Sequence, residues 1–190
     1  MTFGESLVSA LEEVMEQDRR VVVIGGGLVS SGPGQARFAR LRQKYSSRIK
    51  SPPIAELGFC GIAAGAAMAG LRPVAEIMLV DFVGSGLDAL LNQAAKIADF
   101  TAGTWRVPLV ARATCGGGYG DGGQHEQALW GPLAGIPGLR VVVPSTPADA
   151  HRLMASALRS EDAAVFLEHK PLSEAWLAWL GRGGGANRSL

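Results

Sequence analysis

The sequence predicts an α/β fold of three layers, in which a largely parallel sheet carries helices on both faces. Two short stretches of almost wholly apolar residues, 21–24 and 164–167, are typical of strands buried on both faces. Segments with apolar residues at helical spacing alternate with such strands along the chain, as in doubly covered parallel sheets. Glycine makes up 26 of the 190 residues and gathers in clusters, mainly where strands or helices are predicted to end.

The elements follow one another in the order that this fold requires. The first half predicts a helix around residues 7–15, a strand at 21–24, a basic segment at 37–50, a helix at about 57–70 and a strand at 74–78. The second half predicts a helix opened by Asp81 and Phe82 and running to about 97, a strand at 108–112, a glycine-rich loop at 116–124, a buried strand at 141–143, a helix at 148–158 and a strand at 164–167. Ligands of parallel sheets bind at the carboxyl ends of the strands, so we expect the functional site there.

The length predicts one domain with a core of its own. We expect this domain to span residues 1–172. Residues 173–190 differ in kind, because Trp176 and Trp179 favour a short final helix and the glycine-rich end resembles a flexible linker.

Composition narrows the classes of function. Lys and Arg number 18 against 17 Asp and Glu, and this net charge of +1 gives no electrostatic argument for binding nucleic acid or a membrane. Cys60 and Cys115 make neither a disulfide framework nor a zinc site. The start of the chain lacks a basic region before an apolar stretch, and the small-apolar run 62–71 is too short to span a bilayer. We expect a cytoplasmic protein whose partner is a protein or a small molecule.

Glu56 is the most informative single residue, because it lies just ahead of a predicted helix built almost entirely of small side chains. The exposed N–H groups of a first helical turn favour a carboxylate by about 0.3–1 kcal/mol. Small residues at Gly58, Gly61, Gly65 and Ala66 let another backbone approach closely. The pattern predicts either a cofactor-binding acid at a crowded interface or a Glu that only caps a buried helix.

Ordered motifs then connect Glu56 to a known family. They are Pro53-Ile54-Ala55-Glu56-x-Gly58-Phe59, Gly65-x-x-Met68-Ala69-Gly70-Leu71-Arg72-Pro73, Glu76-Ile77-Met78-x-x-Asp81-Phe82, Leu91-Asn92-Gln93-Ala94-Ala95-Lys96, Gln124-His125, and Pro137-Gly138-Leu139 through Pro144. From about Phe3 to Leu172 the chain resembles the pyrimidine-binding domain of thiamine diphosphate enzymes. The resemblance is to the N-terminal domain of the beta subunit of two-subunit 2-oxo acid dehydrogenases, of the acetoin and pyruvate dehydrogenase type.

The resemblance implies roles for five residues. Glu56 matches the acid that hydrogen-bonds N1′ of the aminopyrimidine and relays a proton. Phe82 matches the aromatic residue that stacks on the pyrimidine, and Met78 and Ile77 are expected to line the same pocket, although Met78 at a strand end is also explained as core. His125 matches the histidine that faces the substrate and the incoming acceptor.

Two departures from the family bear on the substrate and on one cofactor contact. Asp121-Gly122-Gly123-Gln124-His125 is similar to the Asp-Gly-Pro-Thr-His run of transketolases, whose residues contact hydroxyls of a ketose donor. Asp121 and Gln124 thereby become candidate substrate contacts. Residues 26–28, Gly-Gly-Leu, stand where many relatives have an acid, which removes one acidic contact near the cofactor.

Two glycine clusters do not complete nucleotide or metal motifs. Residues 25–27 lack the G-x-G-x-x-G spacing, because Ser30 stands where the third glycine belongs. Residues 120–122 resemble the opening of the thiamine diphosphate motif that holds Mg²⁺, but the closing asparagine is absent, since the chain has only Asn92 and Asn187. We therefore expect no metal ligand in this chain.

The missing half of the site implies a partner. The family supplies the diphosphate and Mg²⁺ site from an alpha-type subunit in an α2β2 heterotetramer, so this chain is not expected to be active alone. Three functions stay open: acyl transfer to a lipoyl or acyl-carrier domain after cleavage of a 2-oxo acid, glycolyl transfer from a ketose phosphate by a split transketolase-like enzyme, and non-catalytic support of an alpha-type subunit. Beta subunits of the family continue into a separate C-terminal domain, which this sequence does not include; we expect that domain to be dispensable, supplied by another chain or cut away.

Overall fold

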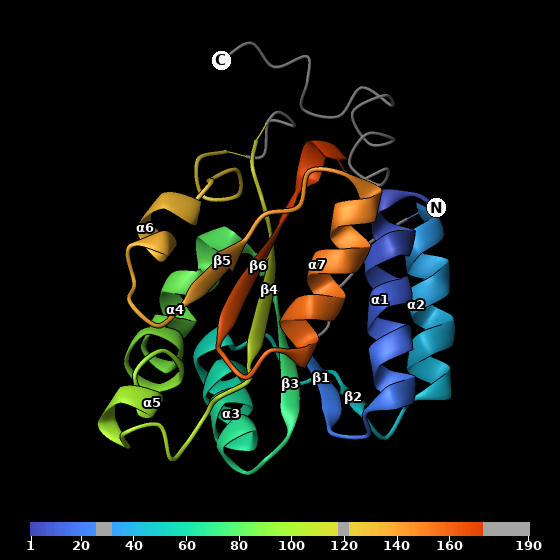
Figure 1. Ribbon diagram of the computed structural model, residues 1–190. Coiled ribbons are helices and arrows are strands. Elements are labelled where there is room, and N and C mark those ends of the chain that lie inside the picture. Colours follow the sequence, from blue (N-terminus) through green and yellow to red (C-terminus); the bar gives the residue numbers. More distant parts are fainter. Residues whose placement is uncertain (26–31, 118–121, 173–190) are drawn as a thin grey trace.

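The computed structural model describes residues 1–25, 32–117 and 122–172. Six parallel strands form one sheet in the order β2-β1-β3-β4-β6-β5, and helices cover both of its faces (Figure 1). This confirms the predicted α/β class and shows that every strand pair is parallel. The strands are β1 Val21–Gly25, β2 Ile49–Lys50, β3 Arg72–Leu79, β4 Val110–Cys115, β5 Arg140–Val142 and β6 Ala164–His169.

The helices fall into two layers. One face carries α1 Phe3–Gln17, α2 Gly32–Lys44 and α7 Pro147–Arg159; the other carries α3 Glu56–Met68, α4 Val83–Asp88, α5 Ile97–Phe100 and α6 Trp130–Ala134 (Figure 1). Each layer buries its own hydrophobic cluster against the sheet. Within the described ranges, no helix is long and apolar enough to cross a membrane.

α1 shows how the sequence fixes an element at its start. Thr2 is the N-cap and Glu5 completes a capping box, in which the Thr2 side chain accepts from the Glu5 backbone and the Glu5 carboxylate accepts from the Thr2 backbone. Residues at helical spacing, among them Leu7, Leu11 and Val14, are 1–2% exposed. The predicted amphipathic helix is thus confirmed.

The helix expected to run from Asp81 to residue 97 is instead broken into several pieces. A 3-10 turn at Val80–Phe82 precedes α4, and a π-helical segment at Ala89–Ala94 separates α4 from α5. The π segment ends where another part of the chain approaches closely. A Cβ on Gly138, whose φ is +87°, would lie 2.1 Å from the carbonyl oxygen of Ala95, and Lys96 Nζ donates to the Pro137 carbonyl.

The strand predicted as buried at 141–143 is an edge strand. Among the described residues β5 pairs only with β6, at the end of the strand order, and Val141 and Val142 are half-buried. Val143, which follows the strand, is 42% exposed. The basic segment 37–50 forms most of α2 and the short edge strand β2.

Arg72 connects the amino end of β3 to the C-terminal end of α7 and the residues that follow it. It starts β3 and is 3% exposed. Its Nε donates to the Leu158 carbonyl at 2.8 Å, Nη2 donates to the Ser160 carbonyl, and Nη1 pairs with Glu161 at 2.7 Å. A buried cation is energetically tolerated when it is paired and hydrogen-bonded in this way. Arg72 lies at the amino ends of the strands, opposite the edge described next.

Candidate active site

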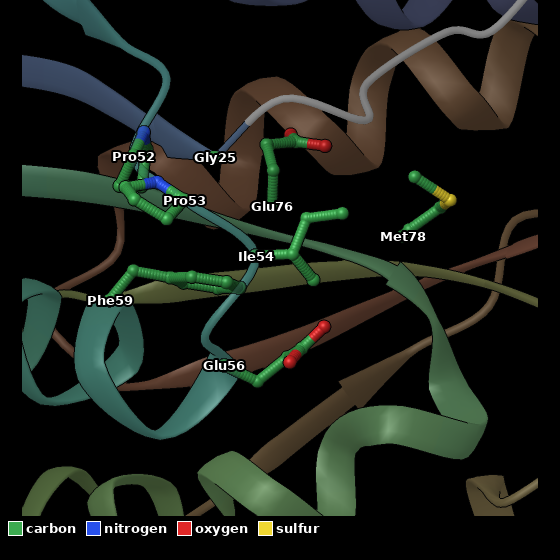
Figure 2. A pocket seen from close by; sticks show the side chains of 8 residues that line it. All are labelled: Gly25, Pro52, Pro53, Ile54, Glu56, Phe59, Glu76 and Met78. Atoms are coloured by element: carbon green, nitrogen blue, oxygen red, sulfur yellow. The ribbon is translucent and has the colours of Figure 1, made fainter.

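A cavity of about 150 Å³ lies at the carboxyl ends of β1 and β3, beside the start of α3 (Figure 2). Its position agrees with the edge at which a parallel sheet binds ligands. The wall is mostly apolar and holds two carboxylates; the lining residues are Gly25, Pro52, Pro53, Ile54, Glu56, Phe59, Glu76 and Met78.

Glu56 is the first residue of α3 and forms part of the cavity wall (Figure 2). The N-cap position is Ala55, which makes no side-chain cap hydrogen bond. Glu56 is half-buried. A carboxylate placed here is favoured by the helix N-terminus and is able to accept a hydrogen bond from an N–H group in the cavity.

Met78 and Ile77 are neighbours near the end of β3, but only Met78 reaches the cavity. Met78 is 49% exposed and lines the cavity, whereas Ile77 is 1% exposed and belongs to the core under α3. The pairing of β3 with β4 is irregular here, since Ile77 pairs with Ala113 and Leu79 with the next residue, Thr114, which leaves Met78 without a register partner on β4. The structure therefore does not place Ile77 on the cavity wall.

Phe82 and His125 come together from distant parts of the chain. Both are half-buried, and their rings meet edge to face with centroids 5.4 Å apart and planes at 89°. His125 N donates to the Gly122 carbonyl at 3.1 Å. Gln124 is exposed beside His125, while Asp121 lies outside the described residues, as do 26–28, Ser30, Trp176, Trp179 and the rest of the tail.

A buried ionic cluster adjoins the cavity. Arg112 Nη1 donates to Glu76 Oε2 at 2.7 Å, and Arg112 Nη2 donates to Glu168 Oε2. All three side chains are at most 3% exposed. Glu76 pairs in register with Gly25 on β1, where a Cβ would lie 2.4 Å from Glu76 Cβ, so the glycine leaves room for the acid.

Sequence reasoning missed the pairing of Glu76 with Arg112. The available signal was one charged residue in the middle of each of two apolar strands, in Val74-Ala75-Glu76-Ile77 and Val110-Ala111-Arg112-Ala113. Burial raises the pKa of the Glu76 carboxyl to about 7, Arg112 opposes this rise, and the charge of Glu168 adds to it. Glu76 Oε1 has no hydrogen-bond partner among the described residues.

The raised pKa of Glu76 predicts a pH-dependent stability. Because its pKa is about 7 in the folded chain against 4.5 ordinarily, the folded state binds more protons between these values. The contribution is fully present below pH 4.5 and is lost as the pH rises through 7. We expect the free energy of unfolding of the wild type, relative to Glu76→Gln, to fall over this window in urea titrations. A difference that does not change with pH contradicts the assignment.

Neither cysteine is expected to be a reactive nucleophile. Cys60 and Cys115 are free and buried, and burial raises the pKa of each thiol to about 12. Thiolates are the reactive form, so neither side chain is suited to nucleophilic attack at neutral pH. In the part of the chain that the structure describes, no group of three or more His, Cys, Asp or Glu side chains is placed to hold a metal ion.

The small-residue face of α3 is open to solvent. A Cβ added to Gly61 or Gly65 would meet nothing within 4 Å. Nearby Ile54, Leu57 and Ile62 are 84%, 64% and 62% exposed, respectively. Within the chain the close approach is made elsewhere on this helix, where a Cβ on Gly86 would lie 2.7 Å from Cys60 Sγ. Exposed apolar residues gathered beside a cavity are typical of an interaction surface.

Comparison with known proteins identifies the fold. The family model described as the pyrimidine-binding domain of transketolase matches residues 1–174. The chain belongs to the transketolase pyrimidine-binding domain family. Solved structures agree at the level of the fold: a split-gene transketolase, described as an inactive beta4 tetramer, has a TM-score of 0.69 at 20% identity and covers 87% of this chain and 50% of that chain.

Within the transketolase pyrimidine-binding domain family, the chain is similar to beta subunits of 2-oxo acid dehydrogenases. The 2-oxoisovalerate dehydrogenase subunit beta of Bacillus subtilis is 37% identical over 171 residues, covering 90% of this chain and 52% of that protein. The mitochondrial pyruvate dehydrogenase E1 component subunit beta of Drosophila melanogaster is 41% identical, with 90% and 47% covered. The acetoin:2,6-dichlorophenolindophenol oxidoreductase subunit beta of Cupriavidus necator is 38% identical, with 86% and 51% covered. The chain thus spans about half the length of these relatives.

Proposed function

We propose that this chain forms the pyrimidine-binding half of a thiamine diphosphate site in a two-component enzyme of the 2-oxo acid dehydrogenase type. The observation that carries the proposal is Glu56, a carboxylate at the start of α3 in the wall of a cavity at the carboxyl edge of the sheet. The family membership and the similarity to dehydrogenase beta subunits support it.

The residues around the cavity fit an aminopyrimidine ring. Glu56 is placed to hold a proton at a ring nitrogen, and Met78 offers an apolar surface in the same wall. Glu76 Oε1, buried and without a partner in the described ranges, leaves room for one more donor. Thiamine diphosphate, when bound, supplies a carbanion next to its thiazolium sulfur and nitrogen. Phe82 is then the stacking residue and His125 the group that faces substrate and acceptor, with Gln124 and Asp121 on the donor side.

The diphosphate and Mg²⁺ belong, in this proposal, to a second chain. None of the described residues forms a metal cluster, and the cavity of about 150 Å³ is small for a whole cofactor. We propose an alpha-type subunit as the source, in an α2β2 heterotetramer, docked against the open face of α3 that Leu57, Gly61 and Ile62 present. Obligate interfaces of this kind commonly bury about 2,000–5,000 Å².

The reaction we propose is cleavage of the bond beside a donor carbonyl, with transfer of the acyl unit to a lipoyl or acyl-carrier domain. The second candidate is glycolyl transfer from a ketose phosphate by a split transketolase-like enzyme, favoured by the spacing of Asp121 and His125.

We also propose that residues 1–172 form the domain and that residues 173–190 form a tail. The free, buried thiols of Cys60 and Cys115 accord with a reducing compartment, and we propose a cytoplasmic location.

Calorimetry tests the shared site. Thiamine diphosphate with Mg²⁺ is titrated into this chain alone and into the chain co-purified with a candidate alpha-type subunit. We expect binding by the pair only. Tight binding by this chain alone contradicts the division of the site between two chains, and binding by neither supports a non-catalytic role.

A further inference from the structure

Lys170 is a fully buried lysine whose ammonium contacts the backbone of the candidate active-site loop. It directly follows β6, begins the 3-10 turn Lys170–Leu172 and is 0% exposed. Its Nζ donates to the carbonyl oxygen of His125, 45 residues away in the sequence. Lysine is almost never fully buried unless it is paired, because removing an ammonium from water is unfavourable. The contact with His125 is therefore a specific feature of this fold.

The 3-10 turn Val80–Phe82 holds the same loop at Gln127, two residues after His125. Asp81 Oδ1 accepts from Gln127 N at 3.2 Å and from Gln127 Nε2 at 2.9 Å. Gly116 N donates to the Gln127 carbonyl at 2.8 Å, which joins the loop to the end of β4. The charges of Lys170, Glu168 and Asp81 all influence the pKa of Cys115, the last residue of β4, so the three groups lie in the neighbourhood of that strand end.

The backbone contacts determine where the His125 ring lies. Asp81 and Phe82 are neighbours in the 3-10 turn Val80–Phe82, and the Phe82 ring meets the His125 ring edge to face. Lys170, the residue after β6, donates to the carbonyl of His125. With the loop held at 125 and 127, the His125 ring keeps its position against Phe82.

We propose that Lys170 is a positioning residue, which fixes the His125 imidazole against Phe82 by binding the His125 backbone carbonyl. This inference deepens the proposed function and depends on it for the chemical role of His125. Small displacements of a reacting group are costly, since a shift of about 1 Å can lower a rate roughly 100-fold.

The first experiment needs no cofactor and no partner. The chain has three histidines, so its imidazole carbon–proton NMR spectrum is simple to assign with His151→Asn and His169→Asn variants. The variant Phe82→Leu shows how much of the chemical shift of the His125 ring protons is caused by the aromatic ring of Phe82. We expect Lys170→Met to remove a large part of that ring-induced shift. The matched control is Arg72→Met, which removes the other buried cation that donates to backbone carbonyls, at the opposite edge of the sheet.

The proposal is overturned if the chemical shift of the His125 ring protons is the same in folded Lys170→Met as in the wild type. If Lys170→Met does not fold, proton exchange in the wild-type chain provides the test. The Lys170 ammonium protons, assigned with Lys170→Arg, are expected to exchange slowly with water because they are buried and bonded to the His125 carbonyl. Fast exchange, like that of the exposed Lys44, overturns the proposal equally.

The second experiment uses the assembled pair and a double-mutant cycle. We expect Lys170→Met to lower kcat at least about tenfold with a smaller change in KM, and to have no further effect in a His125→Asn background, because it acts through His125. Equal effects in both backgrounds contradict the positioning role. Full activity of His125→Asn instead contradicts the proposed function of His125, while the NMR result still decides whether Lys170 positions the ring.

Discussion

Glu56→Gln is expected to lower the turnover of the assembled enzyme at least roughly 100-fold while the chain stays folded. Glutamine keeps the shape of the side chain but cannot release or take up the proton that a carboxylate shares with a ring nitrogen. Glu56 is only half-buried and its N-cap neighbour Ala55 makes no side-chain cap bond, so its replacement removes little native structure. Steady-state kinetics with saturating thiamine diphosphate and Mg²⁺ measures the effect.

The matched control is the same chemical change at Glu16, an exposed residue of α1 that forms a surface ion pair with Lys44, away from the cavity. Glu16→Gln is expected to leave turnover unchanged. Circular dichroism and urea unfolding confirm that both variants are folded. Turnover of Glu56→Gln within a few-fold of the wild type excludes Glu56 as the proton-relay acid.

Arg112→Met is expected to destabilise the fold by about 3–5 kcal/mol, because it leaves Glu76 and Glu168 buried without their shared cation. Methionine has nearly the length of the arginine stem, so the loss reflects charge more than volume. Equilibrium unfolding in urea measures the change. Lys44→Met, which breaks the exposed ion pairs of Lys44 with Glu12 and Glu16, is the control and is expected to cost only about 0–1 kcal/mol.

A triple variant separates charge from packing. Glu76→Gln and Glu168→Gln, added to Arg112→Met, remove the charges of the two carboxylates that Arg112 binds, and we expect most of the lost stability to return. A cost for Arg112→Met below about 1 kcal/mol, or a triple variant no more stable than the single one, contradicts the view that the cluster is held by its charges.

The fold class and most element positions could be predicted from local patterns. Continuous apolar stretches indicated strands β1 and β6, and helical spacing indicated α1 and α7, because burial on one or both faces restricts which residue types are compatible. The exceptions arose where distant segments meet. The π-helical segment at Ala89–Ala94 ends where Ala95 and Lys96 meet Gly138 and Pro137, and β5 stands last in the order of the described strands.

The candidate site, too, could be predicted from the sequence only in part. The motifs of the sequence located Glu56, Met78, Phe82 and His125, and the structure describes each of them at the carboxyl edge of the sheet or in the elements beside it. Only the structure separates Met78 from Ile77, because the pairing of β3 with β4 becomes irregular between Ile77 and Leu79. The roles of these residues stay predictions that the variants above test.

What the sequence determined by itself was therefore the α/β class, the family and the start of α3 to within one residue, at about 57 against the observed Glu56, since each depends on patterns of residues close together in the chain. Only the tertiary structure decided the pairings of Glu76 with Arg112, of Arg112 with Glu168 and of Lys170 with His125, which join residues 36, 56 and 45 positions apart. Local patterns show that a strand residue is charged, but its partner depends on strand order and register, which the packing of the whole sheet sets.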